Sequence, residues 1–405
     1  MKKFVISITS VCSLICTLVL TMVSYYDCSL PDSYYVNSGD SLSINSSFEI
    51  TAKSSVSDTQ AMKNKAGRSD TVTLKLFGAF PIKSVEVNAV ESVMLTPCGT
   101  PFGIKMLTEG VVVIGLGNVN SIEGYICPAK ESGLKVGDII ESIDNKSNLS
   151  NKQISEIVSS SDGKEMTFSV LREDKKLEIK ITPVYSSENG SYMTGIWVRD
   201  SSAGIGTLTY YDNDTGTFGG LGHPVCDIDT GEILPLMSGD VVDVNISGAI
   251  KSIAGSPGEL IGNFISDINV GKILLNNDNG IFGTFKTSPS QHGAVPMGYK
   301  QEVTEGAATI ISTVDSDGPK EYNITIEKID LNDEGTKNMI IRVTDEQLLS
   351  KTGGIVQGMS GSPVLQNGKL VGAVTHVFVN DPHKGYAIFC EKMYNSSKTV
   401  EKNLT

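Results

Sequence analysis

The longest apolar stretch of the chain lies near its N-terminus. Lys2 and Lys3 precede residues 4–26, FVISITSVCSLICTLVLTMVSYY, and the first acidic residue is Asp27. As a helix this stretch would rise by about 35 Å, enough to cross the hydrocarbon core of a bilayer. Lysines on one flank favour the cytoplasmic side, so the pattern predicts a membrane anchor over residues 1–27 and an extracytoplasmic remainder. A cleaved signal peptide is the alternative, although the run is long for one and ends without a small-residue cleavage site.

The rest of the hydrophobic pattern is typical of short strands. Within residues 28–97, residues 28–70 are rich in Ser, Asn, Asp and Thr, which predicts a polar stalk. Residues 71–95 contain alternating β-branched residues, which predicts an N-terminal β region. Residues 185–395 contain many short apolar runs between Gly, Pro and Asx turns, without a sustained 3.6-residue period. We therefore expect a mainly β protein, with one or two closed barrels in this segment and a polar tail over 396–405.

Residues 98–184 form a more specific unit. The segment CGTPFGIKMLTEGVVVIGL is followed by CPAKESGLKVGDIIESIDNK and GKEMTFSVLREDKKLEIKITPV. This order resembles a bacterial PDZ domain, an α+β fold, and Phe102, Gly103 and Ile104 occupy the position of that family's apolar-Gly-apolar carboxylate-binding loop. Backbone N–H groups there would bind the terminal carboxylate of a peptide, which adds to the neighbouring strand edge. The alternative is a PDZ-like fold that packs only against its own chain.

A glycine-rich turn precedes a predicted hairpin near the C-terminus. The dipeptide Asn367-Gly368, between two apolar runs, indicates a type I′ turn. Just before it, residues 358–363 read GMSGSP, which resembles the nucleophile turn of chymotrypsin-like serine peptidases. On that template Ser360 attacks the substrate, and the N–H groups of Gly358 and Ser360 form the oxyanion hole. The alternative is a glycine-rich entry to a hairpin without chemistry.

A serine nucleophile needs a base, and the chain has four histidines. His223 lies in the Gly-rich segment GTFGGLGHPV, as expected for a histidine presented by a loop. His376 lies on a predicted strand, where a structural role is the default, and His292 and His383 lie in turn-like segments. We therefore expect His223 to be the base, in the order His before Ser.

The third member of a triad would orient His223. The sequence leaves several carboxylates open for this role between His223 and Ser360, namely Asp227, Asp229, Asp240, Asp243 and Asp345. A lipase-like order, Ser360, Asp381 and His383, is disfavoured because that class requires a glycine at position 362 and a helix after the turn.

Composition narrows the function further. The formal net charge of −13 argues against nucleic acid as the main partner. The seven cysteines contain no C-x-x-C pair, so the sequence predicts neither a structural zinc site nor a dithiol redox centre. The proposed chemistry requires no metal and no cofactor.

Three segments together point to a family. GLGHPV, IRVTD and GIVQGMSGSPVLQNGKLVGAVTHVFVNDP are similar to the stage IV sporulation protein B peptidases of endospore-forming bacteria, and the anchor and PDZ unit extend the resemblance over the whole chain. The resemblance implies a trypsin-like β-barrel peptidase with His223, Asp345 and Ser360 as the triad.

The same resemblance implies substrates and a location. The peptidase would cut itself in its N-terminal region, leaving the membrane, and would cut the extracytoplasmic part of a membrane protein that restrains an intramembrane metalloprotease. That cleavage would activate a late sporulation sigma factor, in the space between the two membranes around the forespore.

Two other functions stay open at this stage. The protein could be a non-catalytic adaptor, with a PDZ domain that binds membrane proteins and a degenerate peptidase domain. Alternatively, a peptide bound to the PDZ domain could control the peptidase.

Overall fold

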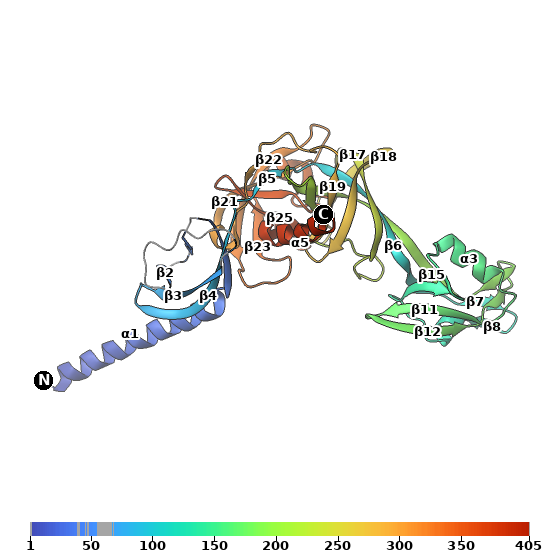
Figure 1. Ribbon diagram of the computed structural model, residues 1–405, viewed down its shortest axis with the longest axis horizontal. Helices are drawn as coiled ribbons and strands as arrows, with labels where there is room; N and C mark the ends of the chain where they lie inside the picture. Colours follow the sequence, from blue (N-terminus) through green and yellow to red (C-terminus); the bar gives the residue numbers. More distant parts are fainter. Residues whose placement is uncertain are drawn as a thin grey trace.

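The computed structural model describes residues 2–38, 41–44, 46, 48–54, 67 and 69–404. Helix α1 (Lys2–Ser29) projects away from the rest of the molecule (Figure 1). Within the described residues, Thr9–Ser29 is the one helical stretch long and apolar enough to span a membrane. The N-terminal apolar helix is therefore a membrane anchor or a signal sequence.

The segment after α1 is a sheet, where the sequence predicted a polar stalk up to residue 70. Its strands lie in the order β1-β4-β3-β2, with β1 parallel to β4. Alternate residues of β3 and β4, among them Leu74 and Val85, are buried with Tyr26 and Leu30 from the end of α1. The prediction of a stalk is wrong for β1 and β2. The polar residues of β1 alternate with buried ones such as Tyr34, and this alternation suits a strand with one buried face. Residues 55–66 of the predicted stalk lie outside the described residues. The strands are β1 (Ser33–Asn37), β2 (Ile50–Ser54), β3 (Ser69–Leu76) and β4 (Phe80–Val90).

Two closed barrels form the centre of the molecule (Figure 1). The first runs in the order β6-β17-β18-β19-β16-β15 and closes through pairing of β15 with β6. The second runs β21-β22-β23-β26-β25-β24. Each has its own buried apolar core. The first comprises β6 (Pro101–Leu116), β15 (Ile196–Tyr211), β16 (Thr217–Gly220), β17 (Leu236–Ile250), β18 (Glu259–Asn277) and β19 (Gly280–Phe285). The second comprises β21 (Gly306–Ser312), β22 (Lys320–Ile329), β23 (Met339–Val343), β24 (Pro363–Gln366), β25 (Lys369–Val377) and β26 (Lys384–Phe389).

Short elements connect the two barrels. Strands β5 (Met94–Pro97) and β20 (Val295–Pro296) extend the first barrel's sheet from β15, and the 3-10 helix η1 (Lys300–Glu302) follows β20. Helix α4 (Glu346–Thr352) leads from β23 toward the serine turn, and α5 (Cys390–Leu404) ends the described chain. Most of the predicted polar tail is thus helical. Helix α5 packs against the barrels through Met393, Ser397 and Val400, which are spaced as residues on one face of a helix.

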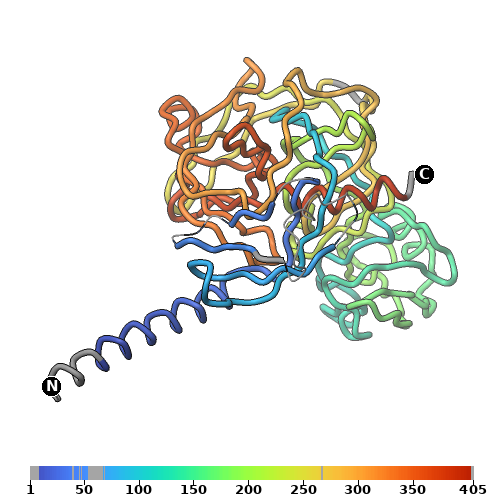
Figure 2. The backbone as a smooth tube through the Cα atoms, turned by 60° about the vertical axis from the view of Figure 1, so that its left-hand side comes forward, coloured from blue at the N-terminus to red at the C-terminus, as the bar shows by residue number. Residues whose placement is uncertain are grey.

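The PDZ domain is inserted between two strands of the first barrel. The first half of β6 and the second half of β15 belong to the barrel. The second half of β6 and the first half of β15 continue into the PDZ sheet (Figures 1 and 2). The predicted boundary at residue 185 therefore places β6 outside a barrel that it helps to close. The inserted elements are β7 (Val119–Ser121), β8 (Gly124–Ile126), α2 (Pro128–Glu131), β9 (Ile139–Ile143), β10 (Lys146–Ser147), α3 (Asn151–Ser159), β11 (Met166–Arg172), β12 (Lys175–Ile181), β13 (Val184–Ser186) and β14 (Ser191–Met193).

Candidate active site

The serine turn connects α4 to the β24–β25 hairpin. Asn367 and Gly368 have φ of 51° and 74°, which confirms the predicted type I′ turn. Gly361, inside the serine turn, has φ of 97°, and a Cβ there would lie 1.9 Å from the carbonyl oxygen of Thr207. Glycine at position 361 is therefore required both by its left-handed backbone and by the close approach of β15.

Thr207, on β15, holds the serine turn in place. Its N–H donates to the carbonyl of Ser360 at 3.0 Å, and its hydroxyl donates to the carbonyl of Gly358 at 2.7 Å. Two residues further on, the Thr209 hydroxyl donates to the carbonyl of Gly361 at 2.8 Å. The first barrel thus fixes three positions of a turn that belongs to the second barrel, and the site lies where the two barrels meet.

These contacts leave the predicted oxyanion donors unused. The carbonyls of Gly358 and Ser360 accept hydrogen bonds, whereas within the described chain their N–H groups donate none. The intervening Met359 and the following Gly361 do donate, to Val356 and Val374 respectively. Two partly exposed donors on one tight turn can stabilise an oxyanion that develops on a substrate carbonyl.

His223 is brought to the same place by the same threonine. The carbonyl of Thr207 accepts a hydrogen bond from the N–H of Leu221 at 3.2 Å, two residues before the histidine. Gly222 lies against β25, where an added Cβ would be 3.0 Å from Cγ2 of Thr375. His223 and Ser360 are therefore held at one junction although they lie far apart in the sequence.

The ring of His223 has a defined tautomer. Its Nδ1 is 2.8 Å from the carbonyl oxygen of Pro224, which can only accept, so Nδ1 carries the proton and donates. The Nε2 atom then carries the lone pair that a general base needs. The orienting contact that a triad draws from a carboxylate is here made by a backbone carbonyl.

Ser360 does not contact His223 directly in this structure. Its half-buried hydroxyl donates to the carbonyl of Thr375 at 2.6 Å. The next residue on β25 is His376, whose ring centroid lies 4.9 Å from the ring centroid of His223. The sequence predicted a structural role for His376, yet its ring lies beside that of His223 at the site. The only local signal was its position on β25, the second strand of the hairpin that follows the serine turn.

Both histidines of the site are neutral at neutral pH. Burial lowers the pKa of His223 below its usual 6.5, and the hydrogen bond to Pro224 offsets this in part. Burial lowers the pKa of His376 to about 4, with smaller effects from the His223 ring and Lys337. A general base must be neutral to accept a proton, and a neutral His223 meets that requirement.

These shifts predict the acid limb of the pH profile. Because the base is active only when neutral, the labelling of Ser360 by a fluorophosphonate should fall with a midpoint below the usual histidine value of 6.5. The rate is measured between about pH 4 and about pH 8, a range that includes the usual histidine pKa. A midpoint at or above 6.5 would contradict the burial of the His223 ring.

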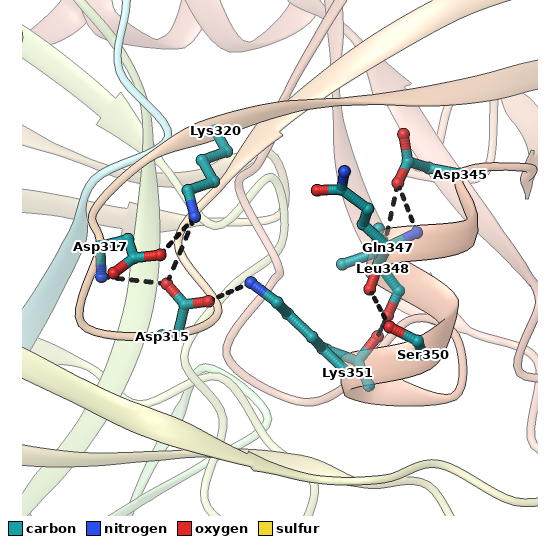
Figure 3. A network of polar contacts seen from close by, with 9 residues as sticks. Asp315, Asp317, Lys320, Asp345, Gln347, Leu348, Ser350 and Lys351 are labelled. Atoms are coloured by element: carbon teal, nitrogen blue, oxygen red, sulfur yellow. Dashed lines mark hydrogen bonds and ion pairs between the residues drawn. The ribbon is translucent and has the colours of Figure 1, made fainter.

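Asp345 lies elsewhere in the hydrogen-bond network. It is the N-cap of α4, where Oδ1 accepts from the N–H groups of Gln347 at 3.0 Å and Leu348 at 3.1 Å (Figure 3). Its Oδ2 accepts from the N–H of Asn323 at 3.2 Å. Among the described residues none of its hydrogen bonds reaches His223, so the contact that the triad assignment requires is not formed here. The far end of α4 is tied down separately, by an ion pair of Lys351 with Asp315.

The two roles of Asp345 predict different mutant behaviour. Asp345→Ala removes the N-cap and should cost about 1 kcal/mol of stability, whereas Asp345→Asn keeps a good cap residue and should cost a few tenths at most. Both variants should keep the labelling rate of Ser360 within about tenfold, since another group orients His223. Thermal unfolding and labelling kinetics measure the two effects. A fall of about ten-thousandfold in Asp345→Asn would instead support the triad assignment.

Three of the four other candidate carboxylates, Asp227, Asp229 and Asp240, are engaged in ion pairs. Asp227 is buried and binds Arg199 at 2.5 Å, while Asp229 binds the same guanidinium at 2.7 Å. Burial raises the pKa of Asp227, but the N–H groups of Thr230 and Asp229 together with Arg199 outweigh it, so the pKa is lowered. Asp240 forms an ion pair with Lys272.

The predicted PDZ carboxylate loop is wrong. Phe102, Gly103 and Ile104 lie inside β6, paired with β15 on one side and β17 on the other. Phe102 and Ile104 are buried in the core of the first barrel. An added Cβ on Gly103 would lie 2.6 Å from Val242, so the glycine serves close packing between strands.

The groove of the PDZ domain is at another place. A groove of about 410 Å³ lies between α3 and the segment from β14 to the start of β15. The α3 wall includes Ile154, Ser155 and Val158, and the strand wall includes Gly195 and Trp197. The sequence TGIWV at residues 194–198 carries an apolar-Gly-apolar pattern in part, but it follows the segment assigned to the PDZ domain.

The described residues contain no cluster of three or more His, Cys, Asp or Glu side chains that could hold a metal ion. The cysteines are free thiols, of which Cys98, Cys127 and Cys390 are buried.

Two barrels with a serine turn and a histidine loop at their junction define a serine peptidase of the trypsin-like class, here with an inserted PDZ domain. The model of the family described as SpoIVB peptidase S55 matches residues 190–394, and the chain belongs to this family. A PDZ domain model matches residues 102–182. None of the curated proteins matches the chain.

Several solved structures are similar to parts of the chain. The PDZ domain of an SdrC-like protein from Listeria monocytogenes is 23% identical over 22% of this chain and 87% of its own, with a TM-score of 0.19. An inactive form of a Mycobacterium tuberculosis protease is 11% identical over 48% of this chain and 84% of its own, with a TM-score of 0.28. The HtrA-type protease AlgW with a decapeptide is 10% identical, covering 51% and 54%, with a TM-score of 0.31.

Proposed function

We propose that the protein is a membrane-tethered, extracytoplasmic serine endopeptidase of sporulation signalling. Ser360 attacks the scissile carbonyl, Nε2 of His223 takes its proton, and the N–H groups of Gly358 and Ser360 bind the oxyanion. Before attack, the Ser360 hydroxyl must leave the Thr375 carbonyl and turn to His223. The observation that carries the proposal is the attachment of both the serine turn and the histidine loop to Thr207.

The substrates are proposed from the family. One substrate is the N-terminal region of the protein itself, whose cleavage would separate the peptidase from α1. The other is the extracytoplasmic part of a membrane protein that restrains an intramembrane metalloprotease. The N-terminal helix supports membrane tethering, and the two lysines before it favour an extracytoplasmic peptidase. The space around the forespore is part of the same proposal.

The test is mass spectrometry of the full chain in detergent, incubated with and without prior treatment with a fluorophosphonate. We expect N-terminal fragments to accumulate in the untreated sample alone, because the reagent occupies the serine that performs the cleavage. Fragment masses then identify the bonds cut. Equal fragments in both samples would assign the cleavage to a contaminating protease.

The adaptor function remains the competing proposal, and the same sample decides it. A folded protein that neither cleaves itself nor reacts with a fluorophosphonate would be a PDZ adaptor with a degenerate peptidase domain.

A further inference from the structure

Three phenylalanines form an exposed cluster at one end of the N-terminal sheet. Phe48, Phe77 and Phe80 are 41%, 46% and 45% exposed. The rings of Phe48 and Phe77 pack edge to face with their centroids 5.8 Å apart, and Phe80 follows in the turn between β3 and β4. The turn, residues 77–81, reads FGAFP and carries no charge. Phenylalanine is usually buried, so three together at one tip indicate a contact surface.

The backbone of this turn is unusual for the residue at its tip. Phe77 and Gly78 have φ of 53° and 68°, and the N–H of Ala79 donates to the carbonyl of Leu76 at 3.1 Å. Left-handed backbone at the first central position of a hairpin turn favours Asn, Asp or Gly and is rare for a bulky side chain. The fold therefore holds a phenylalanine outward at a conformational cost, as expected for a residue kept for a contact.

The sheet is fixed to the helix that precedes it. Tyr26 and Leu30, at the end of α1, are buried in one core with Leu76, and Met22 and Val23 pack against that core. In Figures 1 and 2 the β3–β4 hairpin lies beside α1, with its turn directed back toward the N-terminus of the helix. The aromatic turn and α1 therefore move as one unit.

Strand register gives the position of the turn along α1. Ser33, just after the helix, pairs with Glu86, and β1 and β4 are parallel. Phe80 precedes Glu86 by six residues, which is about 20 Å of strand. The same length corresponds to about thirteen residues of helix. The turn therefore lies beside the second half of α1 and not beyond its end.

The helix sets the level of the bilayer. Counted from Lys3, about twenty helical residues cross the hydrocarbon core, so a tethering α1 leaves the hydrocarbon near Val23. The phenylalanine turn lies at about this level, and so does Tyr25, which is 67% exposed. Aromatic side chains are favoured at the membrane–water interface, where apolar side chains enter the boundary between headgroups and acyl chains.

We propose that Phe48, Phe77 and Phe80 dock into the interface of the extracytoplasmic leaflet, as a second membrane contact beside α1. The inference rests on the membrane tethering in the proposed function and not on the peptidase chemistry. Lipid is the occupant because the helix that enters the bilayer packs on the same sheet. The flanking charges, Glu49 and Lys75, have opposite signs, so the contact depends on apolar insertion and requires no anionic lipid.

The opposite end of the sheet carries this contact to the barrels. Tyr35 of β1 stacks on Tyr299 with ring centroids 6.2 Å apart, and the carbonyl of Tyr35 accepts a hydrogen bond from the side chain of Gln301. Val90, the last residue of β4, packs in the same cluster as Tyr299. Docking of the phenylalanine turn therefore fixes how the peptidase is oriented above the membrane.

The test places a fluorescent reporter at the turn. Trp197 is the single tryptophan of the chain, so Trp197→Phe removes the background, and Ser360→Ala keeps the chain uncut. Phe80→Trp is added, and the full chain is reconstituted in phosphatidylcholine vesicles with or without bromine near the headgroup end of the acyl chains. Brominated lipid should quench about half of the emission, because an interfacial side chain lies within about 5–10 Å of that boundary.

Two further positions frame the measurement. Tyr125→Trp reports from an exposed aromatic of the PDZ domain, which lies at the opposite end of the molecule from α1, and should not be quenched (Figure 1). Leu14→Trp reports from α1 itself and should be quenched. If Phe80→Trp fails to fold, Phe48→Trp repeats the measurement from the other side of the cluster.

A second comparison separates docking from mere proximity to lipid. Phe48→Ser with Phe77→Ser removes two of the three apolar side chains, both exposed. Quenching of the tryptophan at position 80 should then fall about threefold, because interfacial binding scales with the apolar area inserted. Phe264→Ser, which removes an exposed phenylalanine of β18, is the matched control and should leave the quenching unchanged.

Quenching at position 80 no greater than at position 125 would overturn the docking, as would quenching that the serine substitutions leave unchanged. Emission at position 80 that ignores bromine but shifts with the protein-to-lipid ratio would assign the patch to a second copy of the chain. Quenching at position 80 without quenching at position 14 would keep the docking and reject α1 as the anchor. The peptidase is decided separately, by labelling of the wild-type protein.

Discussion

Ser360→Ala is expected to abolish labelling by a fluorophosphonate and to lower peptide cleavage by about a millionfold, the loss typical of a missing serine nucleophile. The reagent bonds to the hydroxyl oxygen, and no other hydroxyl of the turn can replace it. Ser362, two residues on, is fully buried and donates to the hydroxyl of Ser312 at 3.0 Å. Its oxygen therefore faces the second barrel rather than the site.

Ser362→Ala is the matched control, since it removes a hydroxyl from the same turn. It should lose a buried hydrogen bond at a cost of about 1 kcal/mol and keep the labelling rate within about tenfold. Both variants are compared by intact-protein mass after treatment and by thermal unfolding. A labelled Ser360→Ala, or an unlabelled but folded Ser362→Ala, would place the nucleophile at the other serine.

Local sequence was sufficient to predict the parts of the site that local geometry determines. The Asn367-Gly368 turn needs left-handed backbone at both residues, and few residue pairs other than this one adopt it readily. Gly361 likewise follows from a turn that brings the backbone close to β15. Such requirements leave a residue-type signal in a single sequence.

Nonlocal contacts leave no such signal. Thr207 and Gly358 are 151 positions apart, and nothing in the segment around Thr207 distinguishes it from other strand residues. For Asp345 the local sequence does carry a signal, but the signal fits two roles. An aspartate just after a strand and before a helix is equally suited to cap that helix and to orient a histidine, and the hydrogen bonds of this structure favour the cap.

The misplaced PDZ loop has a comparable explanation. An apolar-Gly-apolar triplet suits a carboxylate-binding loop, but it also suits a barrel strand where a neighbour comes close, as Val242 does to Gly103. The choice depends on which strand borders α3. That strand is β15, which begins at Ile196, after the last strand of the inserted domain. Chain order within a domain is not readable from the pattern of one segment.

His223→Ala is expected to lower the labelling rate of Ser360 by about a thousandfold, within the usual range for loss of a general base. The ring centroids of His223 and His376 lie 4.9 Å apart in the site, so the base is identified by comparing the effects of replacing each histidine. His223 has a fixed tautomer with Nε2 free, because Pro224 accepts the Nδ1 proton. Among the described residues, no hydrogen bond fixes either ring nitrogen of His376, whose ring lies beside that of His223.

His376→Ala should therefore lower the rate by less than about tenfold, since this ring neighbours the base without replacing it. Labelling kinetics of both variants, with thermal unfolding to show that each is folded, make the comparison. The reverse order of effects would make His376 the base. The nucleophile, bound to the Thr375 carbonyl, and the base, His376, would then be held at adjacent positions of β25. Equal and large losses in both variants would instead mean that the two rings act as one proton-accepting unit.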